Sequence, residues 1–251
     1  MTNKDLYDLV LYVGNKENFG GYLNAPQFEN QLVTANIVLL KELLGITNDY
    51  NFGMPVSRRQ KGQSTILDDA TNLFKKKGQI SFISGIGALP SDYFKYDSIR
   101  IPNSVGEVEV LFSGEVGERL SNYIDVPTTD FPICEIIGKN VHVYPSSILA
   151  SDIIYYRYPT TPVFDYYVSA SGEMIYLTNG QTHDLTAGEV DSSGNTSGTF
   201  TSTSEELEWG DSEKIDIAWI IIKNMGINLS RQDLTGIASQ TINQGKWSKE
   251  N

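Results

Sequence analysis

The sequence has very little cysteine and histidine: one cysteine, Cys134, and two histidines, His142 and His183, among 251 residues. A single cysteine excludes a disulfide framework within one chain. Because the two histidines lie far apart in sequence and only one cysteine is present, no local spacing supports a zinc site or a Cys/His nucleophilic pair. Cys134 lies in the alternating stretch FPICEIIG, so we expect a strand that turns this thiol inward as a small buried hydrophobe.

Long apolar runs and a secretion signal are also missing. The longest apolar stretch, IDIAWIII, is much too short to cross a bilayer. The first residues, MTNKDLYDLVLYV, have no basic start, no long apolar stretch and no small-residue cleavage site. We therefore expect a soluble protein without a membrane span, made in a cytoplasm.

Positive charge is scarce, because 19 Lys and Arg face 31 Asp and Glu, which gives a net charge of −12. This balance argues against a protein whose main role is to grip phosphate backbones. The cations are also unevenly placed. Residues 51–100 carry eight Lys or Arg against four Asp or Glu, while residues 101–200 carry three against thirteen. One basic segment thus stands beside a strongly acidic remainder.

Helical periodicity marks both ends of the chain. Residues 1–78 hold two predicted helices and a basic arm, and the second helix begins at a capping box formed by Asn24 and Gln27. This helix has two apolar stripes, so we expect other parts of the protein to pack against it on two sides. Residues 212–251 hold a second helix pair, which we expect to pack on the N-terminal helices.

Between the helical ends the pattern changes to period two. Residues 79–211 contain short alternating or apolar runs separated by Gly, Pro, Asn, Asp and Ser, as an antiparallel domain requires. A Gly/Ser/Thr tract over residues 187–204 is too polar for a core, so we expect a variable, mobile loop or a hairpin tip there. The predicted fold class is therefore α+β, with the terminal helices packed as a bundle and a central antiparallel β module.

Six cations of the basic segment are candidates for contact with another subunit. Three lie in an arm predicted over residues 47–65, which shows no period, and three follow a short helical pattern whose C-terminus they suit. Either these charges solvate a loop and a helix end, or they clasp an acidic neighbour such as a second copy of the chain, or they contact nucleic acid. The six residues are Arg58, Arg59, Lys61, Lys75, Lys76 and Lys77.

The stretch DIIYYRYPTTPVFDYY, residues 152–167, gathers five tyrosines within sixteen residues. Strand alternation places Tyr156 and Tyr158 on one face and Tyr155 on the other, and Pro159 interrupts the ladder because it cannot donate a hydrogen bond. Large rings of this kind suit an inner sheet face or a subunit boundary as well as a sugar. These three tyrosines join the subunit-contact candidates.

No constellation has the spacing of a catalytic or cofactor site. The glycine-rich SGIGALP lacks the lysine of a P-loop and the third glycine of a dinucleotide turn. Adjacent carboxylates such as Asp68 and Asp69 do not face one another across a scissile bond. We therefore predict no enzyme activity, no catalytic residue, no cofactor and no metal site.

The resemblance of this chain to a known family rests on five segments in order: GGYLNAPQFENQLVTANIVLLKELLG, ALPSDYFKYDSIRI, RLSNYIDVPTTDFPICEIIGKNVHVYPSS, DIIYYRYPTTPVFDY and ELEWGDSEKIDIAWIIIKNMGINL. In this order they resemble the ring, or head-to-tail connector (adaptor), proteins of tailed bacteriophages, with particular likeness to crAss-like and related Bacteroides phages. The resemblance covers most of the chain except residues 168–204.

The resemblance implies a non-enzymatic virion protein that assembles in the cytoplasm of the bacterial host. It implies a twelvefold ring of this chain in the phage neck, touching the portal and the adjacent tail or ring proteins. Such a ring forms part of the channel through which genomic DNA is ejected, without sequence-specific binding. The alternative, motivated by the tyrosines, is a carbohydrate-binding tail or surface module.

Overall fold

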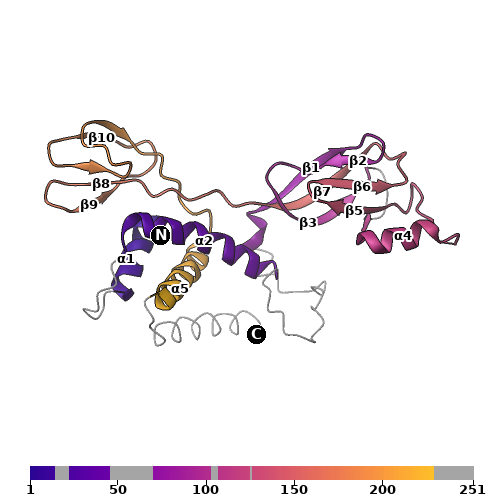
Figure 1. Ribbon diagram of the computed structural model, residues 1–251, viewed down its shortest axis with the longest axis horizontal. Coiled ribbons are helices and arrows are strands. Elements are labelled where there is room, and N and C mark those ends of the chain that lie inside the picture. Colours follow the sequence, from indigo (N-terminus) through magenta and orange to yellow (C-terminus); the bar gives the residue numbers. More distant parts are fainter. Residues whose placement is uncertain (15–22, 46–69, 103–106, 125, 229–251) are drawn as a thin grey trace. The chain divides into compact units, whose positions relative to one another are not determined.

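The computed structural model divides into two compact units (Figure 1). Unit 1 comprises Met1–Leu73 and Pro159–Asn251, and unit 2 comprises Phe74–Tyr158. The chain is mixed α+β with several antiparallel sheets, as predicted, but the β-rich module expected over residues 79–211 is divided between the units. The structure describes residues 1–14, 23–45, 70–102, 107–124 and 126–228.

Helices α1 (Asn3–Gly14), α2 (Ala25–Leu43) and α5 (Asp211–Asn228) belong to unit 1, and α5 contacts both of the others. The start of α2 is a capping box, as predicted. Asn24 Oδ1 accepts a hydrogen bond from Gln27 N at 2.9 Å, and Gln27 Oε1 accepts one from Asn24 N at 3.3 Å. The second helix predicted for the C-terminal pair lies outside the described residues.

Unit 1 also contains short antiparallel strands, including two in the tract expected to be a loop or a hairpin tip. Residues 187–204 hold β11 and β12, which pair with β8 and β10, so the tract contains short strands as well as loop. Here Asp191 accepts hydrogen bonds from Ser193 N and Asn195 N, which fold the polar tract into a turn without an apolar core. The sheets have the orders β11-β8-β9 and β10-β12. Their strands are β8 (Tyr166–Val168), β9 (Met174–Tyr176), β10 (Thr182–Leu185), β11 (Val190–Asp191) and β12 (Gly198–Thr201).

Phe164 joins the strands of unit 1 to its helices. Its ring centroid lies 5.3 Å from that of Phe28 in α2, 5.5 Å from that of Tyr7 in α1 and 4.9 Å from that of Tyr176 in β9. The side chain is almost fully buried. Truncation of a buried phenylalanine of this kind to alanine costs about 3–5 kcal/mol of stability.

A buried amide of α2 holds two distant segments of unit 1. Asn36 Oδ1 accepts a hydrogen bond from Trp209 Nε1 at 2.6 Å, and Asn36 Nδ2 donates to Thr160 O at 3.2 Å. Because a buried polar group without a partner is costly, these bonds fix the chain just after Tyr158 and just before α5.

Unit 2 is built from two sheets. The first has the antiparallel order β1-β7-β3, and the second has the order β2-β6-β5-β4. β4 and β5 pair in parallel, so this edge departs from the predicted antiparallel pattern. Helix α4 (Ser113–Ser121) connects these two strands and contacts β5. The strands are β1 (Lys75–Ser81), β2 (Ile86–Ala88), β3 (Tyr93–Arg100), β4 (Glu109–Val110), β5 (Ile133–Ile137), β6 (Asn140–Tyr144) and β7 (Ala150–Arg157).

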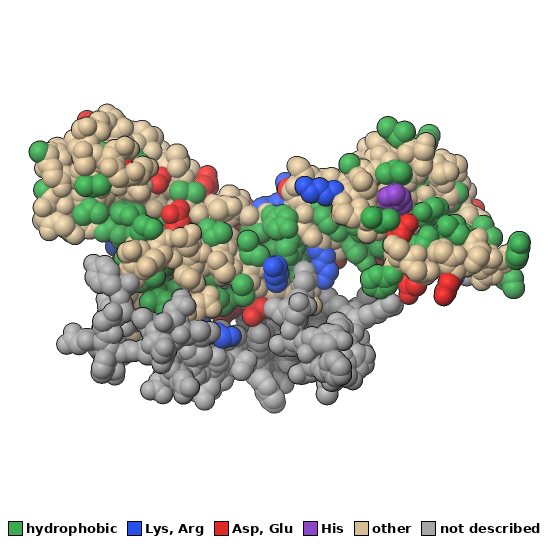
Figure 2. Space-filling model, viewed as in Figure 1, with side chains coloured by type: hydrophobic (Ala, Val, Ile, Leu, Met, Phe, Trp, Pro, Cys, Tyr) green, Lys and Arg blue, Asp and Glu red, His purple; other side chains and the backbone are tan. Residues whose placement is uncertain are grey.

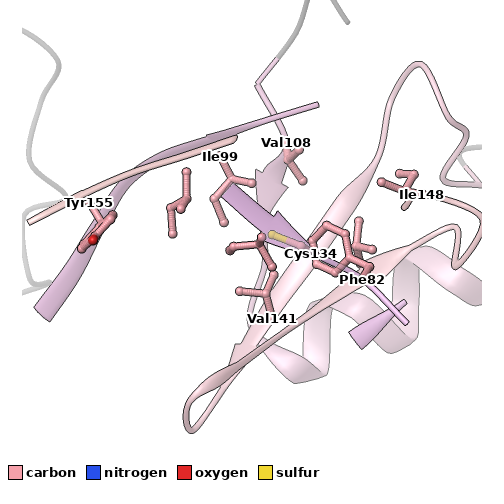
Figure 3. Packing of buried hydrophobic residues seen from close by; sticks show 10 residues of the cluster. Phe82, Ile99, Val108, Cys134, Val141, Ile148 and Tyr155 are labelled. Atoms are coloured by element: carbon pink, nitrogen blue, oxygen red, sulfur yellow. The ribbon is translucent and has the colours of Figure 1, made fainter. Parts of the chain in front are cut away.

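The core of unit 2 lies between its two sheets (Figure 3). Ile99 and Tyr155 enter it from the first sheet, and Cys134 and Val141 enter it from the second. Cys134 is fully buried, which confirms its predicted role as a small hydrophobe. Burial, followed by the neighbouring Glu135 carboxylate, raises the pKa of the thiol to about 12.

β2 approaches the end of β1 so closely that only glycine fits at position 87. A Cβ atom on Gly87 would lie 2.4 Å from Ile80 Cγ2, 2.8 Å from Phe82 Cδ1 and 2.9 Å from Ser81 O. The last of these is a backbone atom, so it cannot move aside as a flexible side chain can.

We expect Gly87→Ala to lower the free energy of unfolding by about 1–3 kcal/mol, because the added methyl group overpacks this contact. Gly117→Ala is the control, since Gly117 lies in α4 with no atom within 4 Å of the added Cβ. It should stabilise the fold by about 0.5–1 kcal/mol. Urea unfolding measures both values, and equal effects of the two changes would contradict the close contact.

Candidate subunit-contact site

The three consecutive lysines begin a strand instead of ending a helix. Lys75, Lys76 and Lys77 are the first residues of β1, and the helical turn before them ends at residue 72. Their predicted place at a helix C-terminus is therefore wrong. β1 pairs with β7, and Lys75 lies opposite Tyr156. The hydrogen bonds between the two strands outweigh the preference of lysines for a helix C-terminus.

Each of the three ammonium groups pairs with a carboxylate of unit 2. Because successive strand residues point to opposite faces, Lys76 makes its pair on one face of the sheet and its two neighbours make theirs on the other. The pairs are partly exposed, so each one contributes little to stability. They are Lys75 with Asp97 at 3.9 Å, Lys76 with Asp92 at 2.7 Å, and Lys77 with Asp152 at 2.9 Å.

Tyr155 and Tyr156 are both buried on β7, with 4% and 2% of their surface exposed, whereas Tyr158 is 51% exposed. Tyr155 belongs to the core between the sheets, and β7 ends two residues before Pro159, as predicted. The Tyr158 ring packs edge to face on Phe94, with centroids 4.8 Å apart. Of the three candidate tyrosines, Tyr158 alone therefore offers an exposed ring to a neighbouring subunit or to a sugar.

Asp92 brings two of the candidates together. Its Oδ1 accepts a hydrogen bond from the Tyr155 hydroxyl at 2.8 Å, and its Oδ2 accepts one from Lys76 Nζ at 2.7 Å. The bond from Lys76 and then that from Tyr155 hold the pKa of Asp92 below its ordinary value. Burial, and then the bond to Asp92, raise the pKa of Tyr155 to about 12. Sequence reasoning missed Asp92, because nothing in SDYFKYD marks a carboxylate that receives two donors.

The described candidates gather at one end of the first sheet of unit 2. In the order β1-β7-β3, the start of β1, the end of β7 and the start of β3 share this end. Cations lie over rings here: Lys75 Nζ is 5.4 Å from the Tyr156 centroid, and Arg157 Cζ is 5.4 Å from the Phe74 centroid. We call this surface the basic aromatic end, and its residues are Lys75, Lys76, Lys77, Phe94, Arg157 and Tyr158.

The remaining candidates, Arg58, Arg59 and Lys61, lie outside the described residues, so the clasping arm stays a prediction.

The two histidines occupy strands. His142 lies on β6 opposite Glu135, and His183 on β10 stacks on Tyr167 and shares a hydrogen bond of 2.9 Å with Glu189.

Comparison with known proteins adds no relative. The chain matches no protein-family model and no curated protein.

Within the described ranges, no group of His, Cys, Asp and Glu side chains is arranged to hold a metal ion. No helix among the described residues has the length and apolar character needed to cross a membrane.

The bond between Tyr155 and Asp92 predicts a pH-dependent stability. Because the folded pKa of Asp92 is depressed, its interactions stabilise the fold above its ordinary value of about 4, and this contribution is lost as the pH falls through the folded pKa. Tyr155→Phe should therefore lower the free energy of unfolding by about 1 kcal/mol at neutral pH, with a smaller difference in acid.

Urea unfolding over a pH series measures this difference. The matched control is Tyr93→Phe, because the Tyr93 hydroxyl accepts a hydrogen bond from Tyr96 N at 3.0 Å instead of donating to a carboxylate. Its effect on the free energy of unfolding should be the same at neutral and acid pH. A loss in Tyr155→Phe that is the same at every pH would show that the charged form of Asp92 is not what the hydroxyl stabilises.

Proposed function

We propose that the protein is a structural virion component that forms an oligomeric ring in the phage neck, between the portal and the tail. The ring forms part of the DNA ejection channel, and the family resemblance implies twelve copies. It contacts the portal and the adjacent tail or ring proteins, and it assembles in the cytoplasm of the bacterial host.

The observation that carries the proposal is the order of the five segments that resemble phage connectors. These segments coincide with α2, β3, the stretch from the end of α4 to β6, β7 and α5, so the resemblance extends over both units. Strands β9 to β12 fall within residues 168–204, the part of the chain outside the resemblance. In this proposal α1, α2 and α5 form a terminal bundle that the helix predicted near the C-terminus completes.

The charge of the chain supports a place beside DNA without tight binding. A net charge of −12 repels phosphates, and such a wall lets a duplex slide past instead of holding it. The DNA is therefore cargo that passes through the ring, and no sequence-specific contact is expected.

The first test is the assembly state of the full-length chain. We expect ring-shaped particles by negative-stain electron microscopy of the chain, alone or mixed with its portal, because each ring subunit must contact two neighbours. We also expect the chain in the neck of purified virions. A chain that is absent from virions, or present there only as a monomer, would contradict the proposal.

The second test concerns the basic arm. Combining Arg58→Glu with Arg59→Glu should reduce ring assembly, most clearly at low salt, because attraction to an acidic neighbouring copy becomes repulsion. Mass photometry measures the assembled fraction. The control is Lys139→Glu, which reverses an exposed lysine of unit 2 outside the arm and should leave assembly unchanged. Normal assembly of the arm variant would show that these arginines only solvate a loop.

A further inference from the structure

Large apolar side chains stand in solvent on and after α4. Tyr123 and Ile124 are 99% and 95% exposed, and Phe131 is 81% exposed. Single exposed apolar residues are ordinary, but six of them between positions 112 and 131 are an unusual concentration and indicate an interaction surface. Figure 2 shows hydrophobic side chains projecting at the end of unit 2 that carries α4. The group, which we call the acidic apolar end, comprises Phe112, Leu120, Tyr123, Ile124, Val126 and Phe131.

The fold of unit 2 holds this surface in place. Arg119 Nη2 donates to Glu109 Oε2 at 2.8 Å and so ties α4 to β4, and Phe112 N donates to Glu115 Oε2 at the start of the helix. Val116 supplies the buried side of α4. The apolar residues are therefore presented by an anchored helix and the chain that follows it.

The exposed charges around the apolar group are acidic. Glu115 and Glu118 on α4 and Asp130 beside Phe131 are all exposed, while the cation of α4, Arg119, is paired with Glu109. A partner that covers this surface must therefore offer apolar area together with positive charge.

Unit 2 itself carries a surface of that chemistry at its other end. α4 follows β4, the next strand after β3 in the chain, and it lies at the end of unit 2 opposite the start of β3, where the basic aromatic end is formed (Figure 1). There, Tyr158 is 51% exposed, and the Lys76 and Lys77 side chains are 51% and 69% exposed. The three lysines are paired with Asp97, Asp92 and Asp152. With Lys95 and Arg157 counted as well, the described residues of this end still carry five positive charges against three negative ones. The two ends of one unit therefore differ in the sign of their net charge, and each has an exposed ring.

We infer that the acidic apolar end of one copy docks on the basic aromatic end of the next copy, so that unit 2 carries both halves of a head-to-tail interface. A like-to-like contact would bring Glu115 and Glu118 against themselves, which costs energy. A head-to-tail contact repeats and closes into a ring when its rotation allows. The inference rests on the proposed function, because it names the surfaces through which the ring assembles.

The first experiment removes the apolar anchors. Combining Tyr123→Ser with Ile124→Ser in the full-length chain should weaken self-association by about tenfold or more, because buried aromatic and aliphatic anchors dominate such interfaces. Thermal unfolding of the unassembled chain should not change, since both residues are exposed. The control is Tyr12→Ser, which changes a side chain of α1 in unit 1 that is 66% exposed. Mass photometry over a concentration series gives the association constants.

The second experiment locates the partner surface. A photo-reactive phenylalanine analogue replaces Tyr123, and light and isotope-labelled chains are mixed before irradiation of the assembly, formed alone or with the portal. We expect mixed-label cross-links from position 123 to residues 75–77, 94 or 157–158 of another copy.

The outcomes separate this inference from the proposed function. If rings form but the Tyr123 and Ile124 variant assembles normally, or position 123 cross-links to itself or to a different protein, the head-to-tail interface is wrong while the ring remains. If the wild-type chain never assembles, either alone, with the portal or in virions, both the proposed ring and the head-to-tail interface are wrong. Weakened assembly together with the expected cross-links supports the inference.

Discussion

The alternation of side chains along β7 is the constraint on which unit 2 depends. β7 lies between β1 and β3, so a slip of one residue in its register would exchange its two faces. In the observed register, Ile153 and Tyr155 enter the core between the sheets, and the Tyr155 hydroxyl reaches Asp92. Asp92 also accepts a hydrogen bond from Lys76, so one carboxylate joins the start of β1 to β7. The register of β7 thus sets both the core and the position of the basic aromatic end.

The tyrosine-rich segment that contains β7 contributes buried aromatic side chains first to unit 2 and then to unit 1. Tyr155 and Tyr156 are buried in unit 2, and after Pro159 the chain enters unit 1, where Phe164 packs on α1, α2 and β9. Burial of aromatic area in two separate cores accounts for much of this aromatic density without a ligand. Two of the five tyrosines that motivated the carbohydrate alternative are therefore buried away from any ligand.

The aromatic side chains best placed for contact with a partner lie elsewhere. Tyr123 and Phe131 are exposed beside α4, where acidic residues surround them, while Tyr158 and exposed lysines occupy the opposite end of the same unit. A unit with two unlike, complementary ends is directional, and direction is what a subunit needs in order to meet two neighbours in a ring. The proposed connector role and the proposed interface thus depend on different observations, the first on segment order and the second on exposure and charge.

Sequence by itself determined the features that depend on neighbours in the chain. The capping box of Asn24 and Gln27, the strands from β5 to β7 and the inward thiol of Cys134 follow from local hydrogen bonding and period-two alternation. Tertiary structure alone decided the features that depend on distant segments. Residues 75–77 form part of a strand because their backbone pairs with β7. The strands within residues 187–204 form because β11 pairs with β8 and β12 pairs with β10. The hydrogen bonds of Asp92 and the exposure of Tyr123 also required the fold, because burial is set by whatever packs nearby and not by the residue's own type.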